Sequence, residues 1–334
     1  MAVMEAPHSS IILIAAFIID LVIGDPNYSY HPVRILGNFI SALQRILKRH
    51  FSNNKITGVF LAILTVLFSI SVYLLILFLF NKINTVAGYL VNIYFVYSLI
   101  ALKDLFNHCR PVIKALNDKD INNARKYIGM IVGRDVNYLD ETGIVRAAVE
   151  TLAENFVDGF LSPVFWFAAG CLGGSVFRIN PVYSGIVLLM IFKAASTLDS
   201  MVGYKTEEFK KIGWAGARLD DLMNFIPARL SLIILFLGAA CSGLDAVSGL
   251  RTSLRDRFKH ESPNSAHSES FAAGAIRARL GGPTRYHDGV KEKPWLGGEF
   301  PDPQASDIKR VIKLLFMSSW ITVSIFSLIL FCLY

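Results

Sequence analysis

The sequence is poor in charged residues and cysteine, and it lacks the loops that common nucleotide-binding folds use. Charged residues make up 18% of its 334 residues, whereas soluble domains carry about 25%. Hydrophobic residues make up 53%, and the mean hydropathy is +0.47. The four cysteines form no CxxC pair, so no disulfide framework is indicated. No GxxxxGK[ST] or GxGxxG stretch occurs, which excludes these two phosphate-binding loops.

Basic residues exceed acidic ones, with 33 Lys and Arg against 26 Asp and Glu and a formal net charge of +7. No basic run is interleaved with aromatic residues, so we expect no nucleic-acid partner. In a membrane protein, this excess instead indicates cytoplasmic loops and contact with anionic lipid. The N-terminus lacks the basic segment and the cleavage site of a signal peptide, so we expect no removed leader.

Long uncharged runs predict several membrane spans. Leu230–Leu244 has only 15 residues and is marginal, and Ile11–Ile23 is short and carries Asp20. We therefore predict an all-α fold, a polytopic integral membrane helical bundle with polar cytoplasmic active-site loops. It would form a single domain over residues 1–334, with a long polar loop at 251–310 that, taken alone, is typical of disorder. The other predicted spans are Ile56–Phe80, Asn84–Leu102, Gly159–Phe177, Ile179–Phe192 and Leu314–Tyr334.

Two basic segments predict the orientation in the cell membrane. Ser41–Lys55 and Lys103–Arg146 are rich in Lys and Arg, so both should be cytoplasmic. If all the polar segments face that side, either Leu230–Leu244 does not cross the membrane cleanly or another short segment compensates for its crossing.

An acidic ladder is the first candidate site. Glu150, Glu154 and Asp158 are four residues apart, so on a helix they share one face, where like charges repel. The surrounding residues are small or apolar, and a membrane segment follows, where carboxylates are costly and usually functional. Such oxygen ligands suit Mg²⁺ together with substrate phosphates. The alternative is a solvated helix face with an Arg146–Glu150 pair.

A second candidate is the stretch from Asp199 through the DDxxN pattern. Asp220, Asp221 and Asn224 form this pattern, close in sequence to arginines. Carboxylates beside arginines are typical either of a salt-bridge cluster or of a Mg²⁺–phosphate site.

Two loop segments complete the candidate set. GDPNYSYHPVR contains glycine and prolines typical of a structured turn, which is also the alternative to a binding role for its polar residues. The segment SPNSAHSESFAAGAIRARLGGPTRYHDGVKEKPWLG has scattered polar residues but no readable Ser/His/Asp triad and no zinc-ligand spacing.

In this order, the polar blocks resemble the CobD/CbiB family of cobalamin biosynthesis proteins across nearly the whole chain. The blocks are GDPNYSYHPVR, IVGRDVNYLDETGIVRAAVETLAENFVDGFLSP, TLDSMVGYK followed by GWAGARLDDLMNFIPARL, and SPNS followed by LGGPTRY and KPWLG. The resemblance implies an adenosylcobinamide-phosphate synthase, an acid–amine ligase. It would join (R)-1-aminopropan-2-ol or its O-phosphate to a propionate carboxylate of adenosylcobyric acid, with ATP and Mg²⁺. It leaves open a homo-oligomer or an association with other enzymes of the corrinoid pathway.

For this chemistry, an activated carboxylate must meet a neutral amine, and phosphates must be held by cations. We expect acid–base roles for Glu150, Glu154 and His267. Metal ligands are expected among Asp158, Asp199, Asp220, Asp221 and Asn224. Contacts to substrate or phosphate are expected from Asp25, His31, Arg34, Arg134, Asn155, Lys205, Arg218, Arg229, Asn264, Arg279 and Lys293.

Three other functions stay open from the residues alone. A prenyltransferase-like enzyme would use acids near the membrane with Mg²⁺, but it predicts DxxxD motifs on two helices. A transporter predicts paired half-structures and charges near the middle of spans. A non-enzymatic scaffold does not account for so many clustered polar residues.

Overall fold

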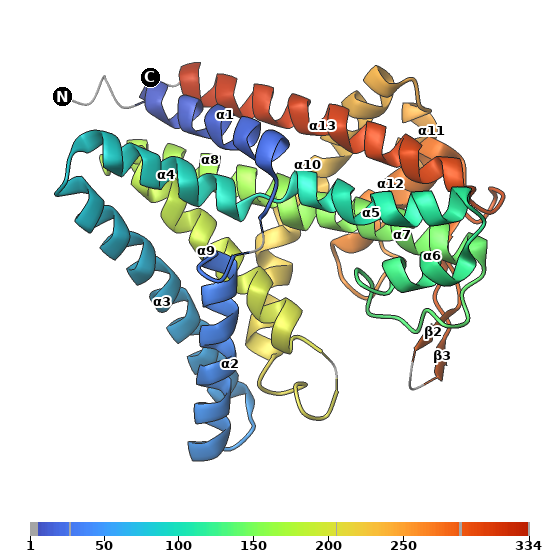
Figure 1. Ribbon diagram of the computed structural model, residues 1–334, viewed down its shortest axis with the longest axis horizontal. Coiled ribbons are helices and arrows are strands. Elements are labelled where there is room, and N and C mark those ends of the chain that lie inside the picture. Colours follow the sequence, from blue (N-terminus) through green and yellow to red (C-terminus); the bar gives the residue numbers. More distant parts are fainter. Residues whose placement is uncertain (1–5, 27, 205, 287–288, 333–334) are drawn as a thin grey trace. The chain divides into compact units, whose positions relative to one another are not determined.

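The computed structural model describes residues 6–26, 28–204, 206–286 and 289–332, and most of them are helical (Figure 1). This confirms the predicted all-α membrane fold. The chain divides into two compact units, each built from separate stretches of sequence. Unit 1 comprises residues 1–101, 162–223 and 323–334, and unit 2 comprises residues 102–161 and 224–322.

Six helices make up most of unit 1. They are α1 (Ala6–Ile23), α2 (Pro32–His50), α3 (Lys55–Asn81), α4 (Thr85–Leu99), α8 (Ser162–Val176) and α9 (Pro181–Val202). Asparagine starts three of them, because the side chains of Asn54, Asn84 and Asn180 each accept a hydrogen bond from a backbone N–H of the first turn. His31 does the same for α2, and Pro32 at its first position has the backbone angle that a helix needs.

Glycines let α8 and α9 approach closely within unit 1. A Cβ at Gly170 would lie 2.5 Å from the carbonyl oxygen of Ser184, and one at Gly174 would lie 2.8 Å from the Ser184 hydroxyl. Gly170 and Gly174 form the GxxxG spacing that allows membrane helices to pack backbone against backbone. Gly173 lies on the same helix, but a Cβ there would meet nothing within 4 Å.

Unit 2 contains shorter helices and two small antiparallel ladders. β1 pairs with β4, and β2 pairs with β3. The helices α10 (Trp214–Ser242) and α13 (Ala305–Cys332) have residues in both units. The remaining elements are α5 (Leu102–Asn117), α6 (Ile121–Ile128), α7 (Glu141–Phe156), a π-helical turn (Val157–Leu161), α11 (Ala246–Asp256), α12 (Ser265–Ile276), β1 (Leu280–Gly281), β2 (Thr284–Tyr286), β3 (Gly289–Lys291) and β4 (Trp295–Leu296).

The described residues of the segment 251–310, which by composition resembles a disordered loop, are instead folded. Every residue of α12 from Ala266 to Ile276 is buried. Small side chains allow this, because a Cβ at Gly274 would lie 2.4 Å from the carbonyl oxygen of Ser248 on α11. The helix packs against α11 and α7. The expectation of disorder was wrong because composition does not register how tightly small residues pack.

The protein is a multi-pass membrane protein. Among the described residues, six helical segments are long and apolar enough to cross a membrane. One of them is the whole of α10, whose 29 residues begin upstream of Leu230, so the marginal 15-residue run is part of a longer candidate span. The others are Lys55–Asn81, Thr85–Asn117, Glu141–Val176, Pro181–Val202 and Ala305–Cys332.

The acidic ladder and the membrane segment after it belong to one continuous helical stretch, Glu141–Val176. The helix therefore continues through Pro163 into the span predicted at Gly159–Phe177. The π-helical turn Val157–Leu161 comes just before this proline. Proline lacks an N–H and its ring clashes with the carbonyl four residues earlier, here that of Gly159, and a π turn opens the helix at that point.

We expect Gly170→Ala to lower the stability of the protein by about 1–3 kcal/mol, because the added methyl group overpacks the contact between α8 and α9. Thermal unfolding in detergent measures the effect. Gly173→Ala on the same helix is the matched control and should leave the melting temperature unchanged or slightly raised. Equal melting temperatures of the two variants would contradict the close packing.

Candidate functional site

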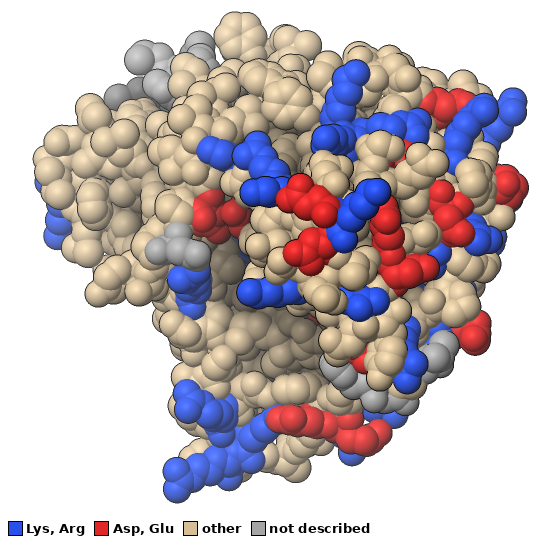
Figure 2. All heavy atoms as spheres, turned by 45° about the vertical axis from the view of Figure 1, so that its right-hand side comes forward, with Lys and Arg blue, Asp and Glu red and all other residues tan. Residues whose placement is uncertain are grey.

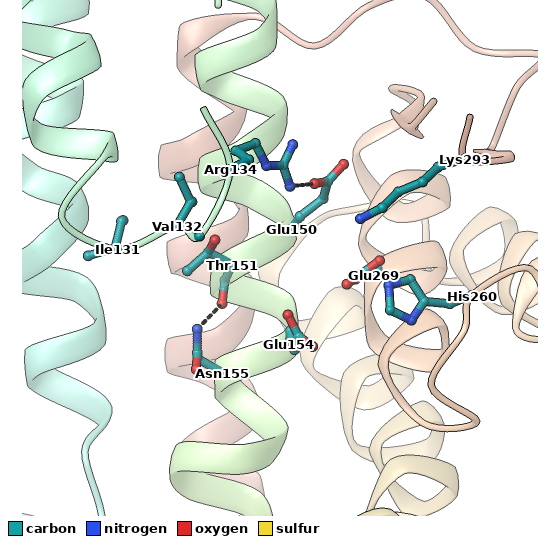
Figure 3. Close-up of a pocket in the computed structure, with 11 residues that line it drawn as sticks. Ile131, Val132, Arg134, Glu150, Thr151, Glu154, Asn155, His260, Glu269 and Lys293 are labelled. Carbon is teal, nitrogen blue, oxygen red and sulfur yellow. Dashed lines mark hydrogen bonds and ion pairs between the residues drawn. The ribbon is translucent and has the colours of Figure 1, made fainter. Parts of the chain in front are cut away.

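A polar pocket of about 210 Å³ lies within unit 2 (Figure 3). Its lining comes from α7, from the loop that follows α6, from the loop before α12, from α12 itself and from the segment between β3 and β4. The ionisable side chains of the lining are Arg134, Glu150, Glu154, His260, Glu269 and Lys293. The rest of the lining is Ile131, Val132, Gly133, Thr151 and Asn155.

Glu150 joins three segments at one side of the pocket. One of its oxygens accepts a hydrogen bond from the Arg134 guanidinium, which forms an ion pair with it. The other accepts a bond of 2.7 Å from the backbone N–H of Gly281 in β1. The Glu150 and Arg134 side chains are only 10% and 13% exposed, so each charge depends on the other. Glu150 therefore pairs with Arg134, and not with Arg146 as in the surface-helix alternative.

The next acid of the ladder is held by the start of α12. Glu154 Oε1 accepts a hydrogen bond of 2.8 Å from the Ser265 hydroxyl. Asn155, beside it on α7, donates its amide N–H to the carbonyl oxygen of Thr151 at 3.0 Å.

Glu269 of α12 is the most deeply buried acid of the lining, at 6% exposure. Burial raises the pKa of its carboxyl well above the ordinary value, and the charges of Glu154 and Glu150 raise it further. Lys293 and Arg134 oppose this shift. Figure 3 shows Glu269 beside His260, with the amine of Lys293 reaching toward the acids.

His260, in the loop before α12, is the imidazole of the pocket. Burial lowers the pKa of His260 below its ordinary value, and Glu154 opposes that shift. A neutral imidazole can accept a proton, so the pocket combines a proton acceptor, buried carboxyls and cations in a small volume.

The structure brings together five of the residues singled out from the sequence. Their chemical roles stay predictions. They are Arg134, Glu150, Glu154, Asn155 and Lys293.

His267 is not part of the pocket lining. It is 1% exposed, its ring lies edge-on to Phe258, and its Nδ1 is 3.2 Å from the Asn264 carbonyl oxygen. Burial and the nearby Arg229 lower the pKa of His267 to about 4, so the ring is neutral at pH 7. Arg229 also contacts the Asn264 side chain at 3.4 Å. These three residues form a group of their own within unit 2.

The other predicted residues of unit 2 also lie outside the lining. Asp158 falls in the π-helical turn, which breaks the four-residue register with Glu154. Arg279 forms two hydrogen bonds of 2.8 Å with Asp302 and lies over the Trp295 ring. Asn224 is buried in α10, at 2% exposure.

The remaining predicted residues belong to unit 1, and Lys205 lies outside the described residues. Asp25 lies 3.1 Å from His31 Nε2, while the other ring nitrogen caps α2. Asp221 lies 3.6 Å from Arg218, the salt-bridge alternative for this segment. The others of this unit are Arg34 in the first turn of α2, Asp199 near the end of α9, and Asp220 in α10.

The carboxylates do not fit a metal held by the protein alone. Within the described ranges, no group of three or more His, Cys, Asp or Glu side chains is placed to hold a metal ion. Mg²⁺ also binds through one or two carboxylates together with substrate phosphates. The predicted metal ligands therefore remain candidates only for Mg²⁺ that is also bound by substrate phosphates. They are Asp158, Asp199, Asp220, Asp221 and Asn224.

No role was predicted from the sequence for two ionisable residues of the pocket, His260 and Glu269. Glu269 carries a usable signal, because it is the one charged residue in the small and apolar run SAHSESFAAGAI, apart from an imidazole. A charged residue in such a run is either exposed to solvent or functional. Because Glu269 is buried, the functional alternative is favoured. His260 stands in a polar loop and carries no comparable signal.

The fold and the pocket together define a multi-pass helical membrane protein with an enzyme-like site of buried acids and bases. The sequence model of the family described as CobD/Cbib protein matches residues 13–315. The chain therefore belongs to the CobD/CbiB family.

Curated relatives align with the chain over nearly its whole length. A cobalamin biosynthesis protein CobD from Pelobacter propionicus is 40% identical over 308 residues, 92% of this chain and 91% of the relative. Proteins of the same name from Citrobacter koseri and Clostridium perfringens are 39% and 38% identical, over 93% and 92% of this chain and 94% of each relative. No solved structure matches the chain.

We expect Glu150→Gln to destabilise the protein by about 3–5 kcal/mol, because it leaves the buried Arg134 charge without a counter-ion. Denaturant or thermal unfolding measures the loss. The exposed pair Lys48–Glu208 provides the control, and Glu208→Gln should cost about 1 kcal/mol or less. A similar small loss in both variants would show that the Arg134–Glu150 pair is not structural.

The raised pKa of Glu269 predicts a pH dependence of stability. Above the ordinary value of 4.5, the unfolded chain releases this proton while the folded chain retains it, so stability falls as pH rises. Glu269→Gln should remove this slope and melt at a higher temperature than the wild type at pH 7, with the difference shrinking toward pH 4.5. Melting curves of both proteins across this range test it, and parallel curves would contradict it.

Proposed function

We propose that the protein is an adenosylcobinamide-phosphate synthase, an enzyme of cobalamin biosynthesis. The proposed reaction joins (R)-1-aminopropan-2-ol or its O-phosphate to the propionate carboxylate of adenosylcobyric acid, with ATP as the energy source. Family membership supports the role in cobalamin biosynthesis. The observation that supports the chemistry is the pocket in which acids, an imidazole and cations meet.

The size of the pocket limits what it can hold. Its volume of about 210 Å³ is below the range of about 300–1,000 Å³ that is typical for drug-sized ligands. It is large enough for the two reacting groups, but not for a corrin ring or a whole nucleotide. The proposal is therefore that only the propionate arm and the small amine enter, while the macrocycle stays outside.

The residues of the pocket suit the two halves of this reaction. Lys293 and Arg134 supply positive charge for a carboxylate or for the phosphate that activates it. Glu154, Glu269 and the neutral His260 offer proton acceptors for the amine, which attacks only after losing a proton. ATP and Mg²⁺ enter the proposal through the family resemblance, and no step is assigned to the metal.

The proposal places the enzyme in the cell membrane with the polar segments on the cytoplasmic side, where ATP is available. The face shown in Figure 2 supports contact with lipid and not with nucleic acid. Broad areas carry no charge, and the Lys and Arg side chains are interspersed with Asp and Glu instead of forming a block of one sign. The prenyltransferase-like alternative has no support, because the acids of the pocket are glutamates and no DxxxD pair lines it.

The test is amidation by the purified protein. Adenosylcobyric acid, (R)-1-aminopropan-2-ol O-phosphate, ATP and Mg²⁺ are supplied, and mass spectrometry should detect the cobinamide phosphate. The same assay with the free aminoalcohol decides which nucleophile is preferred. Absence of product from both amines, with a folded protein, would refute the proposed reaction.

We expect Glu154→Gln to lower the rate of amidation about 100-fold or more, because the pocket loses a carboxylate that can hold or deprotonate the amine. Glu208→Gln on the surface of unit 1 is the control and should retain the wild-type rate. Full activity of a folded Glu154→Gln variant would remove Glu154 from the mechanism.

A further inference from the structure

We propose that the pocket of unit 2 is the subsite for the primary ammonium group of the amine substrate, with Glu269 as the residue that takes its proton. The inference rests on the proposed function for the reaction in which the amine is used. The cation subsite itself follows from the geometry of the pocket.

Glu269 is a buried carboxyl that faces the pocket and has no hydrogen-bond partner among the described residues. It is 6% exposed and lines the cavity. Across the described residues its oxygens form no hydrogen bond or ion pair, whereas Glu150 and Glu154 each accept at least one. A buried polar group without a partner is costly. A ligand with N–H donors would supply the missing partner.

Charged groups surround Glu269 from every segment that lines the pocket. Figure 3 shows Glu150 and Glu154 on α7, Arg134 in the loop before it, and Lys293 on the opposite side. The helix α11 also packs against α12, but it contributes no residue to the lining. His260, in the loop before α12, lies beside Glu269, and burial lowers its pKa so that the ring is neutral. With Glu269 ionised and His260 neutral, the lining has three carboxylates and two cations, so the pocket carries one net negative charge that a single ammonium group would balance.

A primary ammonium fits this pocket better than the other charged groups of the reaction. It is compact, and its three N–H donors can reach several carboxyl oxygens at once. A phosphate in the place of the ammonium group would face three carboxylates, so the activating phosphate belongs at the cations Lys293 and Arg134 instead. Mg²⁺ would need phosphate oxygens as further ligands, because in the described part of the chain no three acidic or metal-binding side chains are placed to hold a metal ion.

Binding and deprotonation can both be written as balanced steps. In the empty pocket burial, together with the neighbouring Glu154 and Glu150 charges, favours protonated Glu269. An incoming ammonium favours the ionised form, so binding releases the Glu269 proton to solvent. In the reaction, one ammonium N–H bond breaks and its proton forms an O–H bond on Glu269. The electron pair stays on nitrogen, and the neutral amine attacks the activated acyl carbon.

Calorimetry on the full-length wild-type protein in lipid nanodiscs tests the subsite directly. The probe is (R)-1-aminopropan-2-ol, and propane-1,2-diol is the control in which a hydroxyl replaces the ammonium. Titrations in two buffers with different heats of ionisation should show about one proton released per amine bound. The amine should bind more tightly as pH rises from about 5 to 7, because less of Glu269 then remains protonated. Equal binding of the diol, or amine binding without proton release, would overturn the proposal.

Glu269→Gln keeps the shape of the side chain and removes its charge. It should weaken binding of the amine about tenfold or more, which is the loss expected for a charge-assisted hydrogen bond. Glu141→Gln is the matched control, because Glu141 is an exposed acid at the start of α7, away from the lining. Unchanged affinity in a folded Glu269→Gln variant would refute the subsite, and proton release by the wild type decides the question if that variant does not fold.

Steady-state amidation separates this inference from the proposed function. Glu269→Gln should raise KM for the amine while leaving KM for the corrinoid unchanged. If the wild type forms the amide and Glu269→Gln keeps the wild-type KM for the amine, the subsite falls and the proposed function stands. If amine binding depends on Glu269 but the protein forms no amide, the proposed function falls and the subsite stands.

Discussion

The structure of unit 2 depends on the neutralisation of one buried charge. Glu150 lies on a helix among small and apolar side chains, where a carboxylate without partners would be costly. Arg134 and the backbone N–H of Gly281 both bind it. These bonds hold the loop after α6, the helix α7 and the strand β1 to one another. The side chains that line the pocket therefore have fixed neighbours before any ligand arrives, which lowers the cost of ordering them on binding.

Small residues give the second constraint, because they decide how closely the helices of unit 2 approach. A Cβ at Gly249 would lie 2.9 Å from the Phe271 ring, and one at Gly274 would meet the backbone of α11. The tight contact buries α12 completely and carries Glu269 into the interior beside the acids of α7. The high pKa of Glu269 is thus a consequence of helix packing, and it is this packing that places a proton acceptor where an amine can reach it.

Hydropathy and short-range spacing predicted much of the fold and part of the site. The uncharged runs gave α3 nearly to its ends, and the four-residue ladder correctly grouped Glu150 with Glu154. The third acid, Asp158, falls out of that group because the π-helical turn changes the register, which a count of residues does not reveal. The predicted span at Leu230–Leu244 was too short because charged residues also belong to the N-terminal part of α10.

The sequence by itself determined the class of fold, the family, and five of the residues that line the pocket, because hydropathy and motif order are properties of neighbouring residues. Only the tertiary structure decided which groups share a charge environment. Glu150 meets a backbone N–H 131 positions later in the chain, and Glu154 meets a hydroxyl 111 positions later. The structure adds Glu269 and His260 to the predicted site and places His267 outside it. Burial and charge pairing arise between segments that local sequence patterns do not connect.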